Sequence, residues 1–284
     1  MDELAYSTFE RVYLEVVGDL LDSLTEEMQR EIARHNIEWM PGRTDFHGYF
    51  LCSAGRYYRA YRAIVNGGAC AVCDVGGFLG VLPVTLARLG FQAAMTETRK
   101  YYSDAFEPLF GKIERYGVAL IDLDPFTEVA ATDQRFDAVL LMAVLEHYPH
   151  SYRTIMENVA RLLTSGGLLY IEVPNIAYWP KRWALLFGHS PLVAPDVKYE
   201  SRVPFIGHHN EFSAADLGSL VDLGGFEILN QQYYNYSRFV RHGMEELLWR
   251  LNPRGWRENM EDVIFALFPK TRECMSVACR PKVR

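Results

Sequence analysis

The chain has 284 residues, of which 49% are apolar and 23% are charged, and its formal net charge is −7. These values are typical of a globular protein with a sizeable core. The acidic balance argues against a nucleic-acid backbone or an anionic membrane surface as the main partner. The amino-terminal segment has no signal-peptide pattern, and the longest apolar run, 138–145, is too short for a membrane span.

Residues 1–68 are predicted to form a helical cap. Apolar residues recur at helical spacing over about 3–35, which indicates one or two amphipathic helices broken near Gly18. The stretch 39–55 is interpreted as loop and turn. A short aromatic helix is expected over 56–65, ending at Gly67 and Gly68.

Residues 69–284 are predicted to form one α/β domain, because short apolar strands alternate there with helices. Two segments interrupt the alternation and are interpreted as insertions, at about 176–210 and about 237–270. Strands are expected at 69–75, 91–96, 118–123, 136–143, 168–173, 226–232 and 274–279, and helices at 79–89, 102–115, 151–163 and 213–223.

Five cysteines include a C-x-x-C pair, Cys70 and Cys73. Because the pair lies in an apolar run with strand character, we interpret both as strand residues rather than as zinc ligands. The spacing of Cys274 and Cys279 does not supply a second half-site. This cysteine usage leads us to expect a reducing, cytoplasmic location.

The turn after the first strand, Asp74-Val75-Gly76-Gly77-Phe78-Leu79-Gly80, indicates a ligand site. Glycine permits close approach of the backbone, and ligands of such sheets bind at the carboxyl ends of the strands. The turn lacks the later glycines of the dinucleotide fingerprint and the lysine of a P-loop. A ligand with a ribose and no phosphate therefore fits it better.

Acidic residues end the next two strands. Glu97 lies 21 residues beyond Gly76, where an acid can accept hydrogen bonds from ribose hydroxyls. The third strand ends in Asp122-Leu123-Asp124, where an acid can accept a hydrogen bond from an adenine amino group. Each acid alone could equally be a capping or solvated loop residue, but the ordered set favours a nucleoside ligand.

These motifs, in this order, resemble those of class I S-adenosylmethionine-dependent methyltransferases over about residues 69–230. The resemblance also covers the segments 135–139, 144–147 and 163–169. It implies a seven-stranded, doubly wound, mostly parallel sheet whose last strand inserts antiparallel, and S-adenosyl-L-methionine as cofactor. The family usually has glycine where Phe78 stands, which is a departure in the turn.

The resemblance also implies the residues that contact the cofactor. The glycine turn frames the methionine moiety, the second strand holds the ribose, the third flanks the adenine, and the end of the fourth lines the site. In this chain those residues are Asp74, Gly76, Gly77 and Gly80, then Glu97, then Asp122 and Leu123, then Met142 and Ala143.

Three histidines are candidates for a general base, since histidine titrates near neutral pH. His147 follows the fourth strand, and His208 and His209 close the first insertion. Neighbours in an extended segment point to opposite sides, so we expect His209 or His147, more than His208, to face the methyl group. Each could instead be a loop or capping residue, and Glu146 could orient His147. No motif fixes a metal geometry among these residues and His150, so no metal is assigned.

The expected function is methyl transfer to a small-molecule acceptor, at a hydroxyl of a sugar, a glycan or a secondary metabolite. Aromatic residues of the first insertion could stack on such an acceptor or pack the insertion onto the domain: Trp179, Trp183, Phe187, Tyr199 and Phe205. The alternative is a catalytically degenerate binding or regulatory subunit. The intact Glu97 and Asp122 disfavour it, and Phe78 slightly favours it. A nucleic-acid partner is not expected, and a homodimer stays open.

Overall fold

The computed structural model describes residues 3–39, 45–130, 132–236 and 253–282 and has an α/β architecture. Its centre is a seven-stranded sheet with the strand order β3-β2-β1-β4-β5-β7-β6. Neighbours among β1 to β5 are parallel, whereas β7 runs antiparallel to both β5 and β6. The predicted seven-stranded, mostly parallel sheet with an antiparallel last strand is therefore confirmed.

The strands lie where the sequence predicts them. β5 begins at residue 163 rather than 168, because an irregularity in its pairing with β4 adds residues to it: Phe136 pairs with Leu163, but Ala138 pairs with Leu168. The strands are β1 (Ala71–Val75), β2 (Gln92–Glu97), β3 (Ala119–Asp122), β4 (Phe136–Met142), β5 (Leu163–Pro174), β6 (Phe226–Tyr234) and β7 (Cys274–Pro281).

The amino-terminal helices differ from the predicted ones. α1 (Tyr6–Leu21) runs through Gly18, and the break falls after it, where the Thr25 hydroxyl accepts from the Met28 N–H at the start of α2 (Glu26–Ala33). α3 (Phe46–Asn66) begins ten residues before 56, so the prediction of a loop up to residue 55 was wrong. Asp45 caps α3 by accepting from the Gly48 N–H at 2.9 Å.

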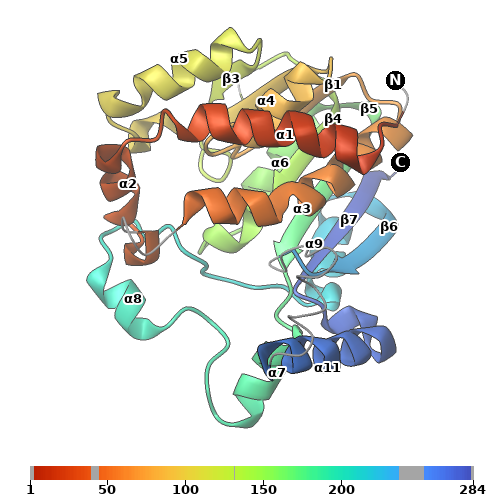
Figure 1. Cartoon of the computed structure of the whole chain (residues 1–284). Coiled ribbons are helices and arrows are strands. Elements are labelled where there is room, and N and C mark those ends of the chain that lie inside the picture. The colour runs from red at the N-terminus through yellow and green to blue at the C-terminus, as the bar shows by residue number, and fades with distance from the viewer. Residues whose placement is uncertain (1–2, 40–44, 131, 237–252, 283–284) are drawn as a thin grey trace.

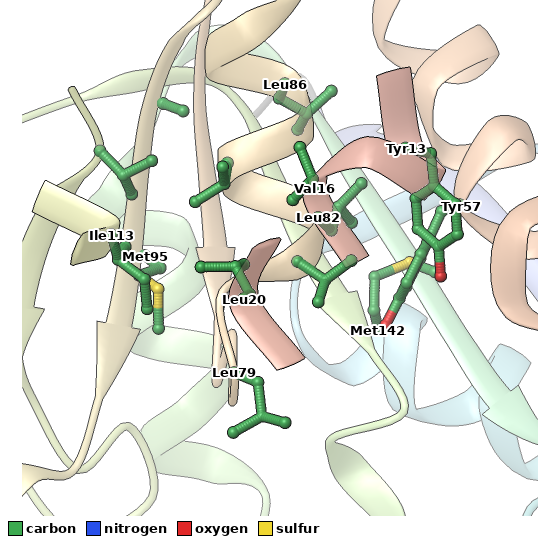
Figure 2. Close-up of a cluster of buried hydrophobic side chains, with 14 of the residues drawn as sticks. Tyr13, Val16, Leu20, Tyr57, Leu79, Leu82, Leu86, Met95, Ile113 and Met142 are labelled. Carbon is green, nitrogen blue, oxygen red and sulfur yellow. The ribbon is translucent and has the colours of Figure 1, made fainter. Parts of the chain in front are cut away.

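Helices cover both faces of the sheet (Figure 1). On one face α1 and α3 share a core with α4 (Val81–Arg88) and α5 (Glu107–Arg115). On the other face lie α6 (Arg153–Leu162) and α9 (Ala214–Leu223). Figure 2 shows Val16 of α1 beside Leu82 of α4, so the amino-terminal helices and the sheet share a continuous core.

The first insertion contains α7 (Trp179–Leu186) and α8 (Pro195–Glu200) and returns to the amino-terminal helices. The Arg202 N–H donates to the Arg34 carbonyl at 2.7 Å, and the Ile206 N–H donates to the His35 carbonyl at 3.1 Å. Of the second insertion, residues 237–252 lie outside the described residues, and α11 (Pro253–Leu267) follows. Among the described helices, none is both long and apolar enough to cross a membrane.

Candidate active site

The turn between β1 and α4 has the backbone shape that the glycines predict. Gly76 and Gly80 have φ angles of 69° and 76°, and a Cβ on Gly80 would lie 2.6 Å from Cδ1 of Ile113. At Gly77 an added Cβ would lie 3.0 Å from Cβ of Met95. A side chain at either position would press against the core, so glycine fits this turn best.

Phe78 adopts a left-handed conformation, with φ 51°, at the position where the family usually has glycine. Such a conformation costs a non-glycine residue about 1–2 kcal/mol. Two kinds of contact offset that cost. The Phe78 N–H donates to the Glu97 carboxylate at 2.8 Å, and the Phe78 ring packs against Trp39 and Phe46 with centroid separations of 5.3 and 6.4 Å. The departure from glycine thus leaves the shape of the turn intact.

Two acids lie at the ends of β1 and β2, Asp74, which is buried, and Glu97, which is half-buried. Asp74 is 4% exposed, and its Oδ1 has no hydrogen-bond partner. Burial and the nearby Glu97 raise the pKa of Asp74 to about 8. Glu97 accepts from the Tyr102 hydroxyl at 3.1 Å as well as from the Phe78 N–H, and burial raises its pKa to about 7. An orphaned buried carboxylate oxygen and a second acid beside a glycine turn fit an amino group and ribose hydroxyls.

The residues expected at the adenine also lie at this edge of the sheet. Asp122 pairs with Glu97 in the register of β3 and β2 and is exposed, while its Oδ1 accepts from the Arg99 N–H at 3.0 Å. Leu123 is buried, and its N–H donates to the Glu97 carbonyl at 3.2 Å. Asp124 has a structural role, because its carboxylate accepts from Phe126 and Thr127 in the following turn.

The two residues expected at the end of β4 differ in burial. Met142 is buried in the core under α1 and α3, and Figure 2 shows it beside Tyr57. Ala143 is half-buried with φ 56°, and its N–H donates to the Glu172 carbonyl at 3.0 Å. This second left-handed residue, next to the glycine turn in the sheet order, changes the chain direction at the candidate site.

Glu146 and His147, in the turn after β4, form a cluster with His208 at the end of the first insertion. Glu146 is fully buried, neither of its carboxylate oxygens has a hydrogen-bond partner, and burial raises its pKa to about 7. The His147 Nδ1 lies 2.6 Å from the Ile206 carbonyl oxygen. Burial and the neighbouring His208 lower the pKa of His147 to about 4. The two histidine rings are 4.9 Å apart and nearly perpendicular.

His209 lies apart from this cluster. Its Nε2 donates to the Phe205 carbonyl at 2.8 Å, and its ring packs against the Phe205 ring. The His209 N–H donates to the Glu146 carbonyl at 2.7 Å. This backbone contact orients the segment so that His208, not His209, sits beside His147. His208 thus lies beside His147, whereas His209 contacts Phe205, and the expectation about which histidine faces the methyl group stays a prediction.

The aromatic residues of the first insertion mostly contact one another. Trp179 stacks on Trp183, and Trp183 meets Phe187, with centroid separations of 5.9 and 5.1 Å along α7. Trp183, Phe187 and Tyr199 are exposed. Of the five, Phe205 is the one next to the histidine segment. From the sequence, Tyr102 is not identified as a site residue, and Glu146 is identified only as a group that could orient His147.

The strand order with its antiparallel β7, the glycine turn after β1 and the acid at the end of β2 define a class I S-adenosylmethionine-dependent methyltransferase. Residues 29–231 match the family model described as a methyltransferase domain, and the chain belongs to that family. S-adenosyl-L-methionine is accordingly the cofactor of this class of protein.

Two known proteins resemble the chain in different ways. The mitochondrial ubiquinone biosynthesis O-methyltransferase of Candida albicans is 32% identical over 121 residues, a match that spans 39% of this chain and 35% of that protein. The crystal structure of magnesium protoporphyrin IX methyltransferase from Synechocystis PCC 6803 with bound S-adenosylhomocysteine has a TM-score of 0.51 and 14% identity, and covers 89% of this chain and 92% of that one. This second likeness supports the fold.

Proposed function

We propose that the chain transfers the methyl group of S-adenosylmethionine to a hydroxyl oxygen of a small-molecule acceptor, such as a sugar, a glycan unit or a secondary metabolite. The observation that carries the choice of oxygen is the Glu146–His147–His208 cluster beyond β4. A hydroxyl must lose its proton when it is methylated, and this cluster holds groups that accept a proton or polarise an oxygen. The partly matched relative from Candida albicans is itself named an O-methyltransferase, which supports the same choice.

We assign the residues at the strand ends to the cofactor contacts that the family resemblance implies. Asp74, through its unpartnered Oδ1, receives the amino group of the methionine moiety, and Glu97 accepts from the ribose hydroxyls. Gly76, Gly77 and Gly80 allow the backbone to approach. When bound, the cofactor supplies a methyl carbon that bonds to the acceptor oxygen while its bond to sulfur breaks, sulfur keeping the electron pair. The protein then contributes mainly proximity and orientation.

The site must also remove the proton of the acceptor hydroxyl. Glu146, with a pKa of about 7, is better suited to hold a proton near neutral pH than His147, whose pKa is about 4. The competing proposal, a degenerate subunit without activity, gains no support from this arrangement. A non-catalytic domain has no need of a buried, unpartnered carboxylate at Asp74 or at Glu146.

Cofactor binding is the first test of this proposal. Isothermal titration with S-adenosylhomocysteine is expected to give a dissociation constant in the micromolar range, or about −7 to −8 kcal/mol. The absence of both heat and a thermal shift with millimolar ligand would contradict the proposed methyl transfer.

The Glu97→Ala variant tests the ribose contact. Removing the carboxylate leaves two ribose hydroxyls unpaired, so affinity for S-adenosylhomocysteine is expected to fall by about 1.5–3 kcal/mol. Glu114→Ala, an exposed acid on α5, is the matched control and should bind as the unaltered protein does. Equal affinity in both variants would remove Glu97 from the site.

The acceptor atom is tested with matched pairs of small molecules that carry either a hydroxyl or an amine on the same ring. Transfer of labelled methyl from S-adenosylmethionine is expected to the hydroxyl members only. Methylation confined to the amines would contradict the proposal while leaving the cofactor assignment in place.

A further inference from the structure

Glu146, His147 and His208 form a compact group of potential metal ligands. One ligand atom from each residue lies within 4.8 Å of the other two. Within residues 3–39, 45–130, 132–236 and 253–282, no other group of three or more such side chains meets that distance. His150 and His209 lie close to these residues in the sequence but are outside the group.

The Glu146 side chain is the first reason to expect a cation here. It is fully buried, and neither carboxylate oxygen has a hydrogen-bond partner among the described residues. Removing a carboxylate from water without a partner is costly, so such a group holds a proton or faces a cation. The group thus combines one buried, unsatisfied carboxylate with two imidazole rings.

The outer contacts of the two histidines are the second reason. A carbonyl oxygen only accepts, so the His147 Nδ1 facing the Ile206 carbonyl carries the proton, and Nε2 keeps its lone pair. The His208 Nδ1 lies 3.8 Å from a carboxylate oxygen of Glu211, which also pairs with Lys181. Metal-bound histidines typically donate their second ring N–H to a carbonyl or a carboxylate, and a group of each kind lies beside these rings.

We propose that Glu146, His147 and His208 bind a divalent transition-metal cation, for which Zn²⁺ is the best match. Two imidazole nitrogens and one carboxylate oxygen are a ligand set that catalytic zinc uses, with a fourth position open. Tetrahedral bonds of ~2.0–2.1 Å put ligand atoms ~3.3 Å apart. The group therefore has to contract by about 1.5 Å or less. The His208 side chain, 36% exposed, has room to make that movement.

The role of the cation deepens the proposed function and rests on it. An acceptor hydroxyl that takes the open position would have its pKa lowered, so its proton could leave to solvent before the oxygen bonds to the methyl carbon. Glu146, His147 and His208 would then be ligands, with their lone pairs engaged, and Glu146 would no longer hold the acceptor proton. Cation binding itself does not depend on the acceptor and can be measured alone.

The experiment titrates ZnCl₂ into tag-free, chelator-treated, full-length protein by calorimetry. All proteins carry Cys70→Ser, because the Cys70 thiol is exposed and free and would compete for zinc. The parent is expected to bind one Zn²⁺, and His208→Ala and Glu146→Gln are expected to bind at least about tenfold more weakly. His150→Ala is the matched control, since His150 is an exposed neighbour outside the group, and it should bind as the parent does.

Absence of one-site zinc binding by the parent, or parent-like affinity in His208→Ala, would overturn the inference. Circular dichroism checks that each variant is folded. If Glu146→Gln does not fold, the visible spectrum of the Co²⁺-loaded parent replaces it, and the lack of tetrahedral bands counts against the site. Titration with S-adenosylhomocysteine separates the two proposals. Cofactor binding without zinc binding refutes only this inference, and the reverse result refutes only the proposed function.

Discussion

Asp74 is buried and Glu97 is half-buried at the ends of adjacent strands, and their partial removal from water makes both acids costly to ionise. Burial raises the pKa of Asp74 to about 8 and that of Glu97 to about 7. The proposed function gives a physical reason for both acids, because a ligand with an amino group and hydroxyls would supply each with a partner. At the scale of single residues, these two acids therefore lower the stability of the folded protein when no ligand is bound.

The Asp74→Asn variant tests this cost through its pH dependence. The folded state of the unaltered protein binds the Asp74 proton more tightly than the unfolded state, whose pKa is near 3.8. Stability is therefore lost as pH rises from about 4 through about 8. The amide has no proton to lose, so the variant should gain stability relative to the unaltered protein across that window, on the order of a few kcal/mol.

Urea unfolding at pH 5 and pH 8, without cofactor, measures this difference. Asp22→Asn, at an exposed acid after α1, is the control and should have the same free energy of unfolding as the unaltered protein at both pH values. If Asp74→Asn also has that free energy, the Asp74 carboxylate already has a partner in the free protein.

At the scale of elements, a buried ion pair connects α3 with β5. The Arg56 Nε donates to Oε2 of Glu172 at 2.8 Å, and both side chains are at most 3% exposed. The guanidinium also lies over the rings of Tyr57 and Tyr236. Because Glu172 is paired with Met142 in the sheet register, this contact sets the position of the amino-terminal helices over the candidate site.

Arg56→Met is expected to destabilise the protein by about 3–5 kcal/mol, because it leaves the Glu172 charge buried and unpaired. The double variant Arg56→Met, Glu172→Gln removes that charge and should recover much of the loss. Thermal or urea unfolding of both variants measures the difference. If the double variant is no more stable than the single one, packing rather than charge explains the loss.

At the scale of the whole molecule, the amino-terminal helices belong to the core of the sheet domain. α1 alone contributes five fully buried side chains, Phe9, Tyr13, Val16, Val17 and Leu20. The matched family region begins at residue 29 and so excludes α1. The division into a helical cap, 1–68, and a methyltransferase domain, 69–284, stays a prediction, and in the structure the two parts share one apolar cluster.

Deleting residues 1–24 should therefore prevent folding. Full burial of a large apolar side chain contributes about 1.5–3 kcal/mol, so five of them approach the whole stability of a typical domain, about 5–15 kcal/mol. Soluble yield and a cooperative thermal transition are the measurements, and deletion of residues 1–3 is the control. A truncated chain that still melts cooperatively would mean that α1 is an independent addition.

The sequence by itself determined the sheet, the glycine turn and the acid at Glu97, because these depend on local signals. Strands have a two-residue period, a left-handed turn needs glycine, and a strand end lies where its apolar run stops. Helix boundaries near Gly18 and before residue 56 were misjudged because capping by Thr25 and Asp45 competes with weak propensities. The tertiary structure alone decided that Glu146 meets His208, 62 residues later. That meeting depends on backbone hydrogen bonds from His209 and Asn210 to the Glu146 carbonyl, which no periodicity in the chain encodes.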